Sequence, residues 1–162
     1  MTPPPEVLAA YPVLAGVTPE PIDSLINQTF RLRGARGSFI LQRVHPVFSA
    51  AIHTNIEAVT RHLAGQAFPT PTLVPTVDGA LCLDTKEGVW RVLTCIEGET
   101  HDRASGPQWL ESAGDLVGRF HRALAELNHE FVGLRHGVHD TPAHLRTLES
   151  ALAERADHRL FA

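Results

Sequence analysis

The chain has 162 residues, of which 43% are hydrophobic, and this is enough for one domain with a core of its own. Its formal net charge of -4 provides no positive field for nucleic acid or an anionic membrane surface, so we expect neither as a partner. No stretch approaches the roughly 20 consecutive apolar residues of a membrane helix. The first residues also lack the basic start and apolar run of a signal peptide, so a cytoplasmic protein is expected. Cys82 and Cys95 have neither CxxC spacing nor a secretory context and are expected to be reduced thiols.

The first 21 residues hold six of the chain's twelve prolines. Their density predicts an irregular lead-in, because proline removes a backbone donor and fixes its own backbone angle. The short apolar run at residues 7–11 predicts one packed helical turn inside it. We do not expect functional residues in this segment.

A β-hairpin is predicted next. Residues 30–33 alternate between apolar and charged side chains, Gly34 and Gly37 can form a turn, and residues 38–44 are rich in strand formers. His45-Pro46 ends the second strand. A helix over residues 47–64 follows, with Gly65 as its stop. It is predicted from apolar residues at steps of four and three, namely Phe48, Ile52, Ile56, Val59 and Leu63.

The second half begins with an extended edge at residues 68–75, where three prolines limit strand pairing. Two further strands are predicted at 80–83 and 89–96. A long amphipathic helix is predicted over 109–127, and a last helix after Asp140-Thr141-Pro142, with Leu145, Leu148 and Leu152 facing inward. The order predicts an α+β protein, with a lead-in at 1–21, a small antiparallel sheet with one helix at 22–98, and the first helices of a helical lobe at 99–162.

Several local phrases make the chain resemble a known family. They are Ile26-Asn27-Gln28-Thr29-Phe30, Phe39-Ile40-Leu41-Gln42-Arg43-Val44, Asn55-Ile56-Glu57-Ala58-Val59-Thr60-Arg61-His62-Leu63, Trp90-Arg91-Val92, Ile96-Glu97-Gly98 and Val138-His139-Asp140-Thr141-Pro142. In this order and spacing they resemble the phosphotransferase family of aminoglycoside phosphotransferases and choline kinases, most closely its N-acetylhexosamine 1-kinase-like sugar kinases. The resemblance covers residues 22 to about 155. It implies a protein-kinase-like small lobe, ATP and Mg2+ as cofactors, and a small hydroxylated acceptor such as a sugar or an amino alcohol.

The resemblance also implies a phosphate-binding cation. In a kinase-like small lobe, one strand residue carries a positive charge to the nucleotide phosphates, and a carboxylate on the next helix holds it in place. Arg43 is the candidate cation here and Glu57 its candidate partner. The register leaves an alternative open, because neighbouring strand residues point to opposite faces. If Gln42 points inward instead, the phosphate contact becomes a neutral amide and the ion pair disappears.

Further nucleotide contacts are implied at two other places. The connector Thr94-Cys95-Ile96-Glu97 resembles the hinge whose backbone binds the adenine edge, with Ile40 against the ring. Asn27 lies in the segment that resembles the phosphate loop. There Asp23-Ser24-Leu25 stands where relatives carry glycine, which is expected to weaken nucleotide binding.

The catalytic part of the family pattern is missing from these residues. Phosphoryl transfer in this fold uses a His-x-Asp followed by an Asn, and then a second Asp that binds the metal. The chain contains no His-x-Asp, and its last asparagine is Asn128. We therefore expect a fragment of a phosphotransferase that has no catalytic residue or magnesium ligand and is inactive alone. Its long helix would expose an apolar face and promote self-association.

Two alternatives remain open. The first is a non-catalytic, pseudokinase-like module that binds a nucleotide or a protein. The second is a metal site at His136, His139, Asp140 and His144, because imidazole and carboxylate groups suit zinc or iron.

Overall fold

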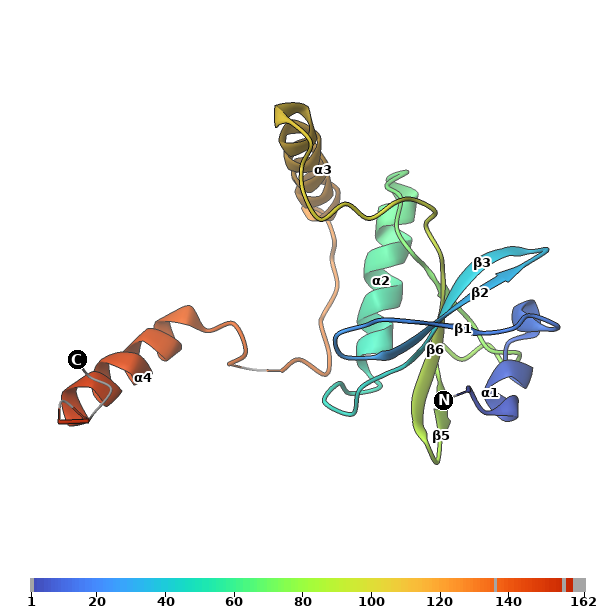
Figure 1. Ribbon diagram of the computed structural model, residues 1–162, viewed down its shortest axis with the longest axis horizontal. Helices are drawn as coiled ribbons and strands as arrows, with labels where there is room; N and C mark the ends of the chain where they lie inside the picture. Colours follow the sequence, from blue (N-terminus) through green and yellow to red (C-terminus); the bar gives the residue numbers. More distant parts are fainter. Residues whose placement is uncertain (1, 136, 156, 159–162) are drawn as a thin grey trace.

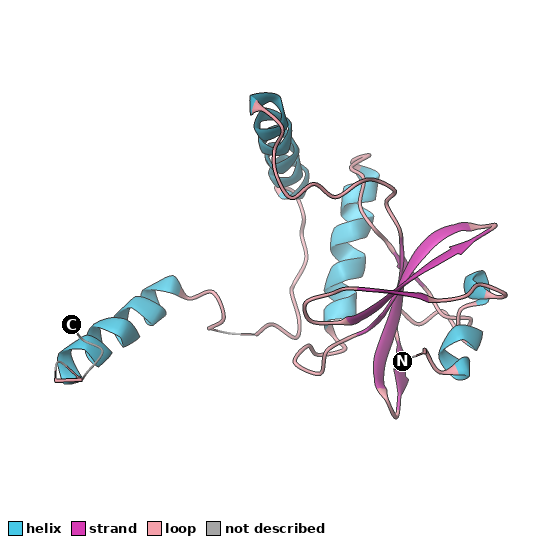
Figure 2. Ribbon diagram, viewed as in Figure 1, coloured by secondary structure: helices cyan, strands magenta, loops and turns pink. Residues whose placement is uncertain are grey.

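The computed structural model describes residues 2–135, 137–155 and 157–158 (Figure 1). A twisted sheet lies between a short N-terminal helix on one side and a longer helix on the other (Figure 2). The elements in chain order are α1 (Pro5–Ala9), the 3-10 turn η1 (Pro12–Leu14), β1 (Glu20–Ile22), β2 (Gln28–Gly34), β3 (Gly37–Arg43), α2 (Ile52–Gly65), β4 (Leu73–Val74), β5 (Leu83–Thr85), β6 (Gly88–Thr94), α3 (Pro107–Leu124) and α4 (Thr141–Glu154). The predicted α+β class is confirmed.

The strands form one antiparallel sheet in the order β1-β2-β3-β6-β4, with β5 also paired to β6. The predicted hairpin is confirmed as β2 and β3. Its register runs from Gln28 opposite Arg43 to Gly34 opposite Gly37, and Gly37 has a positive φ of 115° that favours glycine. β4 lies at the sheet edge, as the prolines around it predict.

Several element boundaries differ from the prediction. β5 begins at Leu83 instead of residue 80, and β6 ends at Thr94 instead of residue 96. The turn between them sets the pairing. Thr85 Oγ1 accepts from the Glu87 N–H at 3.2 Å and donates to the Gly88 carbonyl at 2.9 Å, which fixes Thr85 opposite Gly88. Strand formers alone do not reveal that register.

One face of the sheet carries the hydrophobic core. Alternate strand residues pack there against the N-terminal segment, and the buried set is Val7, Tyr11, Leu14, Phe30, Leu32, Phe39, Leu41, Trp90 and Val92. The predicted helical turn is confirmed as α1. The Tyr11 hydroxyl donates to the Trp90 carbonyl at 3.2 Å, and burial raises the pKa of that hydroxyl above its usual range. The N-terminal segment therefore closes this face of the sheet.

The helix α2 covers the opposite face (Figure 2). It starts at Ile52, later than predicted, because residues 45–51 form turns in which the Ser49 hydroxyl accepts from the Ala51 N–H at 3.2 Å. It ends at Gly65, the predicted stop. Leu63 is its buried apolar residue, and the polar residues His53, Asn55 and Thr60 are buried beside the sheet and the following segment. This face is consequently more polar than the core face.

The helices α3 and α4 stand clear of the sheet (Figure 1). Neither has a buried residue, so the expected exposure of the long helix is confirmed. Asp140 caps α4 by accepting from the Ala143 N–H at 3.0 Å. The predicted inward orientation of Leu145, Leu148 and Leu152 is wrong, since they are 53%, 54% and 47% exposed. No element of the described chain packs on that face. None of the described helices has the length and apolarity needed to cross a membrane.

We predict that the N-terminal segment contributes to the stability of the sheet. Leu14 is 1% exposed, so Leu14→Ala should lower the free energy of unfolding by about 2–4 kcal/mol. The matched control Leu25→Ala, at a fully exposed position, should change it by less than about 0.5 kcal/mol. Urea denaturation measures both. Equal effects would show that residues 12–14 do not belong to the core.

The exposed face of α3 is predicted to cause self-association. Replacing Leu110 and Val117 together with glutamine should shift the chain toward monomer, because both side chains are more than half exposed. Sedimentation velocity at several concentrations measures the shift. Glu111→Gln, on the same helix, is the control and should leave self-association unchanged.

Candidate functional site

The orientation of β3 decides which of its residues faces α2. Phe39 and Leu41 lie in the core, so Arg43 shares their face of the strand. Ile40 and Gln42 point to the opposite face, toward α2. Of the two alternatives that the sequence leaves open, Gln42 is therefore the inward residue.

Arg43 lies away from α2, where its side chain passes over Gly88. A Cβ at Gly88 would come within 3.4 Å of the Arg43 Nε. Arg43 also helps to line a hollow of about 250 Å3 together with Ile26, Gln28, Val44, His45 and Pro46. The expected Arg43–Glu57 ion pair does not form, because strand alternation separates Arg43 from the helix. Glu57 instead forms an ion pair with Arg61, one helical turn further on.

Gln42 takes part in a polar network across three strands. Arg91 lies directly opposite it on β6, and the Arg91 Nε donates to the Gln42 Oε1 at 2.9 Å. The Gln42 Nε2 in turn donates to the Thr29 Oγ1 on β2 at 3.4 Å. Both ends of the amide are thereby used, which orients Gln42 and holds Arg91.

Three side chains on this face have buried nitrogen atoms without a hydrogen-bond partner in the described structure. They are the Nε of Arg31, the Nη1 of Arg91 and the Nε2 of His53. Burial lowers the pKa of Arg91, yet an arginine remains charged at neutral pH. Within the described chain, neither Arg31 nor Arg91 forms an ion pair. Arg31 and Arg91 therefore lie on the α2 face without an ion-pair partner in the described chain, whereas Arg33 on the same face pairs with Glu20.

The segment before β2 is held by side-chain hydrogen bonds. The Asn27 Oδ1 accepts from the His45 N–H at 3.0 Å, and the Asn27 carbonyl accepts from the Ser24 hydroxyl. Leu25 points fully into solvent. Asn27 thus ties the start of β2 to the end of β3, and serine replaces glycine in stabilising the turn.

The connector after β6 begins with two residues that still belong to the sheet. The Thr94 N–H donates to the Thr72 carbonyl at 2.9 Å, and the Cys95 N–H donates to the Ser38 carbonyl at 3.0 Å. Ile96 and Glu97 follow as exposed chain, and residues 96–98 make no backbone–backbone hydrogen bond within the described part. Ile40 and Leu93 are paired on the α2 face just before this connector.

These residues can be compared with known proteins. The sequence model described as the phosphotransferase enzyme family matches residues 18–162. The chain belongs to this family. Among solved structures, it is similar to an amicoumacin kinase in complex with AMP-PNP, Ca2+ and Ami, with a TM-score of 0.68 and 16% sequence identity. The similarity covers 93% of this chain and 48% of the kinase, so this chain spans about half the length of that protein. The kinase-like small lobe expected from the sequence is confirmed.

Sequence reasoning missed the three side chains with unpartnered nitrogen atoms on the α2 face. Arg91 and Arg31 each alternate with buried apolar neighbours on their strands, and this alternation was the available signal. His53 is 2% exposed and lies beside Arg91 although it comes from α2. Its role depends on packing between distant segments, so no local pattern could have revealed it.

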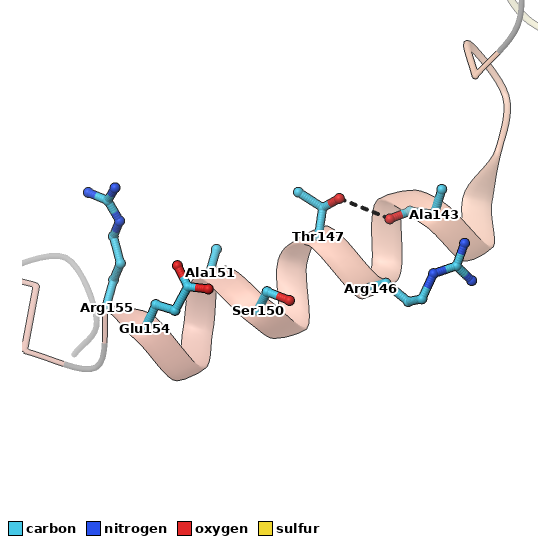
Figure 3. Close-up of a pocket in the computed structure, with 7 residues that line it drawn as sticks. All are labelled: Ala143, Arg146, Thr147, Ser150, Ala151, Glu154 and Arg155. Carbon is cyan, nitrogen blue, oxygen red and sulfur yellow. Dashed lines mark hydrogen bonds between the residues drawn. The ribbon is translucent and has the colours of Figure 1, made fainter.

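A hollow along α4 is open to solvent on the side away from the helix. The hollow along α4, about 520 Å3, is lined by Ala143, Arg146, Thr147, Ser150, Ala151, Glu154 and Arg155 (Figure 3). One helix and its end supply all of these residues, so no second element encloses a ligand. Across the described ranges, no group of three or more His, Cys, Asp or Glu residues could hold a metal ion. His136 of the alternative metal site lies outside the described residues.

The buried His53 predicts a pH dependence of stability. Burial first, and the charge of Arg91 next, lower its pKa from the usual value near 6.5, although the bond from Nδ1 to the Ala50 carbonyl, 2.7 Å long, opposes this. The unfolded chain takes up a proton as the pH falls through about 6.5, whereas folded His53 resists it. The free energy of unfolding is therefore fully retained at neutral pH, and it decreases as the pH falls below about 6.5.

Urea denaturation at pH 7.5 and pH 5.5 tests this. His53→Gln should lose less stability between the two values than the wild type does. His139→Gln, in the exposed loop before α4, is the matched control and should follow the wild type. An unchanged pH dependence in His53→Gln would contradict the assignment.

Proposed function

We propose that this chain forms the nucleotide-binding small lobe of an ATP-dependent phosphotransferase. The observation that carries the proposal is the pair Ile40 and Leu93 on the α2 face, next to a connector whose residues 96–98 make no backbone–backbone hydrogen bond in the described chain. Two half-buried aliphatic side chains can pack on an adenine ring, while backbone N–H and C=O groups bind its edge. The nucleotide analogue bound to the similar kinase supports this choice of ligand.

The acceptor in the proposal is a small hydroxylated molecule, such as a sugar or an amino alcohol. Family membership supports the class of reaction, and the sequence phrases favour a relative of the N-acetylhexosamine kinases. The bound Ca2+ in the similar kinase supports a divalent ion in the family. In the present chain, the described residues do not fit a magnesium site, because they bring no set of three acidic or histidine ligands together.

We further propose that the chain alone binds nucleotide but does not transfer its phosphate. The absence of a His-x-Asp from the sequence supports this, since that motif positions the acceptor hydroxyl in kinase-like enzymes. A non-catalytic binding module is the second candidate, favoured by the exposed Leu25 where close contact to phosphate is needed. The first candidate predicts adenosine binding, and the second predicts binding of a nucleotide or of a protein.

Calorimetric titration of the full chain with adenosine and with ATP tests the proposal. Both ligands should bind to the folded monomer. Ile40→Ala should weaken both by roughly five- to tenfold, because apolar contact with the ring is lost. The control Val77→Ala removes an exposed aliphatic side chain from a distant loop and should have no effect. A folded chain that binds neither ligand contradicts the proposal.

A further inference from the structure

We propose that Arg91 on β6 binds a phosphoryl group in this site, and that Gln42 on β3 positions it. The inference rests on the proposed function and names a residue for its phosphate contact. The ligand is defined by its chemistry, a phosphoryl anion, which a nucleotide or free phosphate can supply.

The first step concerns the missing cation of β3. A kinase-like small lobe places a positive charge on this strand, facing the helix. In this chain the position facing α2 is the neutral Gln42, and Arg43 faces the other way. If the lobe binds phosphate, a positively charged residue on another strand must therefore take the place of the cation that β3 lacks on this face.

The second step concerns the geometry of Arg91. It occupies the neighbouring position across the β3–β6 ladder, directly opposite Gln42. Its Nε is used in the 2.9 Å bond to the Gln42 Oε1, while its Nη1 is buried without a partner in the described chain. A guanidinium held at one edge keeps its remaining N–H groups in a fixed fork, which matches phosphate oxygens.

The third step concerns charge. Gln42 holds Arg91 without neutralising it, because an amide carries no charge. A buried cation with only a neutral partner is costly, and an anionic ligand offsets that cost. Arg31 offers a second unpartnered Nε from β2, opposite Ile40 and one residue pair along the sheet. The sheet thus carries two guanidinium groups on one face that form no ion pair in the described chain, while Glu20, opposite Arg31 on β1, pairs with Arg33.

The experiment compares ATP, adenosine and inorganic phosphate on the full chain. Arg91→Met should weaken ATP binding by roughly ten- to a hundredfold and leave adenosine binding within about twofold. Arg43→Met is the matched control, the same substitution on the opposite face, and should leave both affinities unchanged. An increase in melting temperature caused by phosphate in the wild type, and lost in Arg91→Met, would identify free phosphate as a second source.

A second variant keeps the test valid if Arg91→Met does not fold. Gln42→Glu places a carboxylate against the Arg91 Nε, which neutralises the cation and repels phosphate. It should lower ATP affinity by at least tenfold without weakening adenosine binding.

An unchanged ratio of ATP to adenosine affinity in both variants overturns the inference, as does a loss of ATP affinity in Arg43→Met alone. A wild type that binds no adenosine but is stabilised by phosphate through Arg91 would contradict the proposed function and leave this inference standing.

Discussion

The antiparallel pairing of β3 with β6 is the constraint on which the rest of the structure depends. It places Leu41 opposite Val92 and Gln42 opposite Arg91. Since adjacent strand residues point to opposite faces, burying the first pair in the core commits the second pair to the α2 face. A shift of one residue would move Leu41 and Arg43 to the α2 face and turn Gln42 toward the core. The strength of the apolar core therefore determines the chemistry of the opposite face.

The two faces of the sheet differ in how their polar groups are satisfied. On the core face, Tyr11 gives its hydroxyl proton to the Trp90 carbonyl while its ring packs among aliphatic and aromatic side chains. On the α2 face, Arg31, Arg91 and His53 retain buried nitrogen atoms without a partner in the described chain, and on the core face the Trp90 Nε1 does. Natural proteins satisfy nearly all buried polar groups, so each of these exceptions calls for an explanation such as a ligand or an ordered water. The apolar core lies on one face, and three of these four exceptions lie on the other.

A single buried amide connects the small lobe to the segment that follows α3. The Asn55 Nδ2 donates to the Val132 carbonyl at 2.7 Å, and its Oδ1 accepts from the Val132 N–H and from His129, both at 3.0 Å. A second tie joins the His62 Nε2 to the Ala123 carbonyl at 2.7 Å. These bonds anchor residues 123–132 to α2, whereas α3 and α4 keep their apolar faces exposed. The rings of Phe68 and Phe120 also meet, with centroids 5.8 Å apart, so polar and apolar contacts together hold this segment to α2.

The sequence by itself determined the β2–β3 hairpin, the end of α2 at Gly65, the start of α4 near Asp140 and membership in the family. Turn glycines, capping residues and apolar periodicity act over a few residues, so they can be read locally. It did not determine whether Gln42 or Arg43 faces α2, because both fit a strand equally well. It also predicted that Leu145, Leu148 and Leu152 would be buried, although amphipathic spacing shows only that a face is apolar and not that another element covers it. Only the tertiary structure brought Arg91 opposite Gln42 and His53 within the electrostatic influence of Arg91, because strand register and helix packing join residues that lie far apart in the chain.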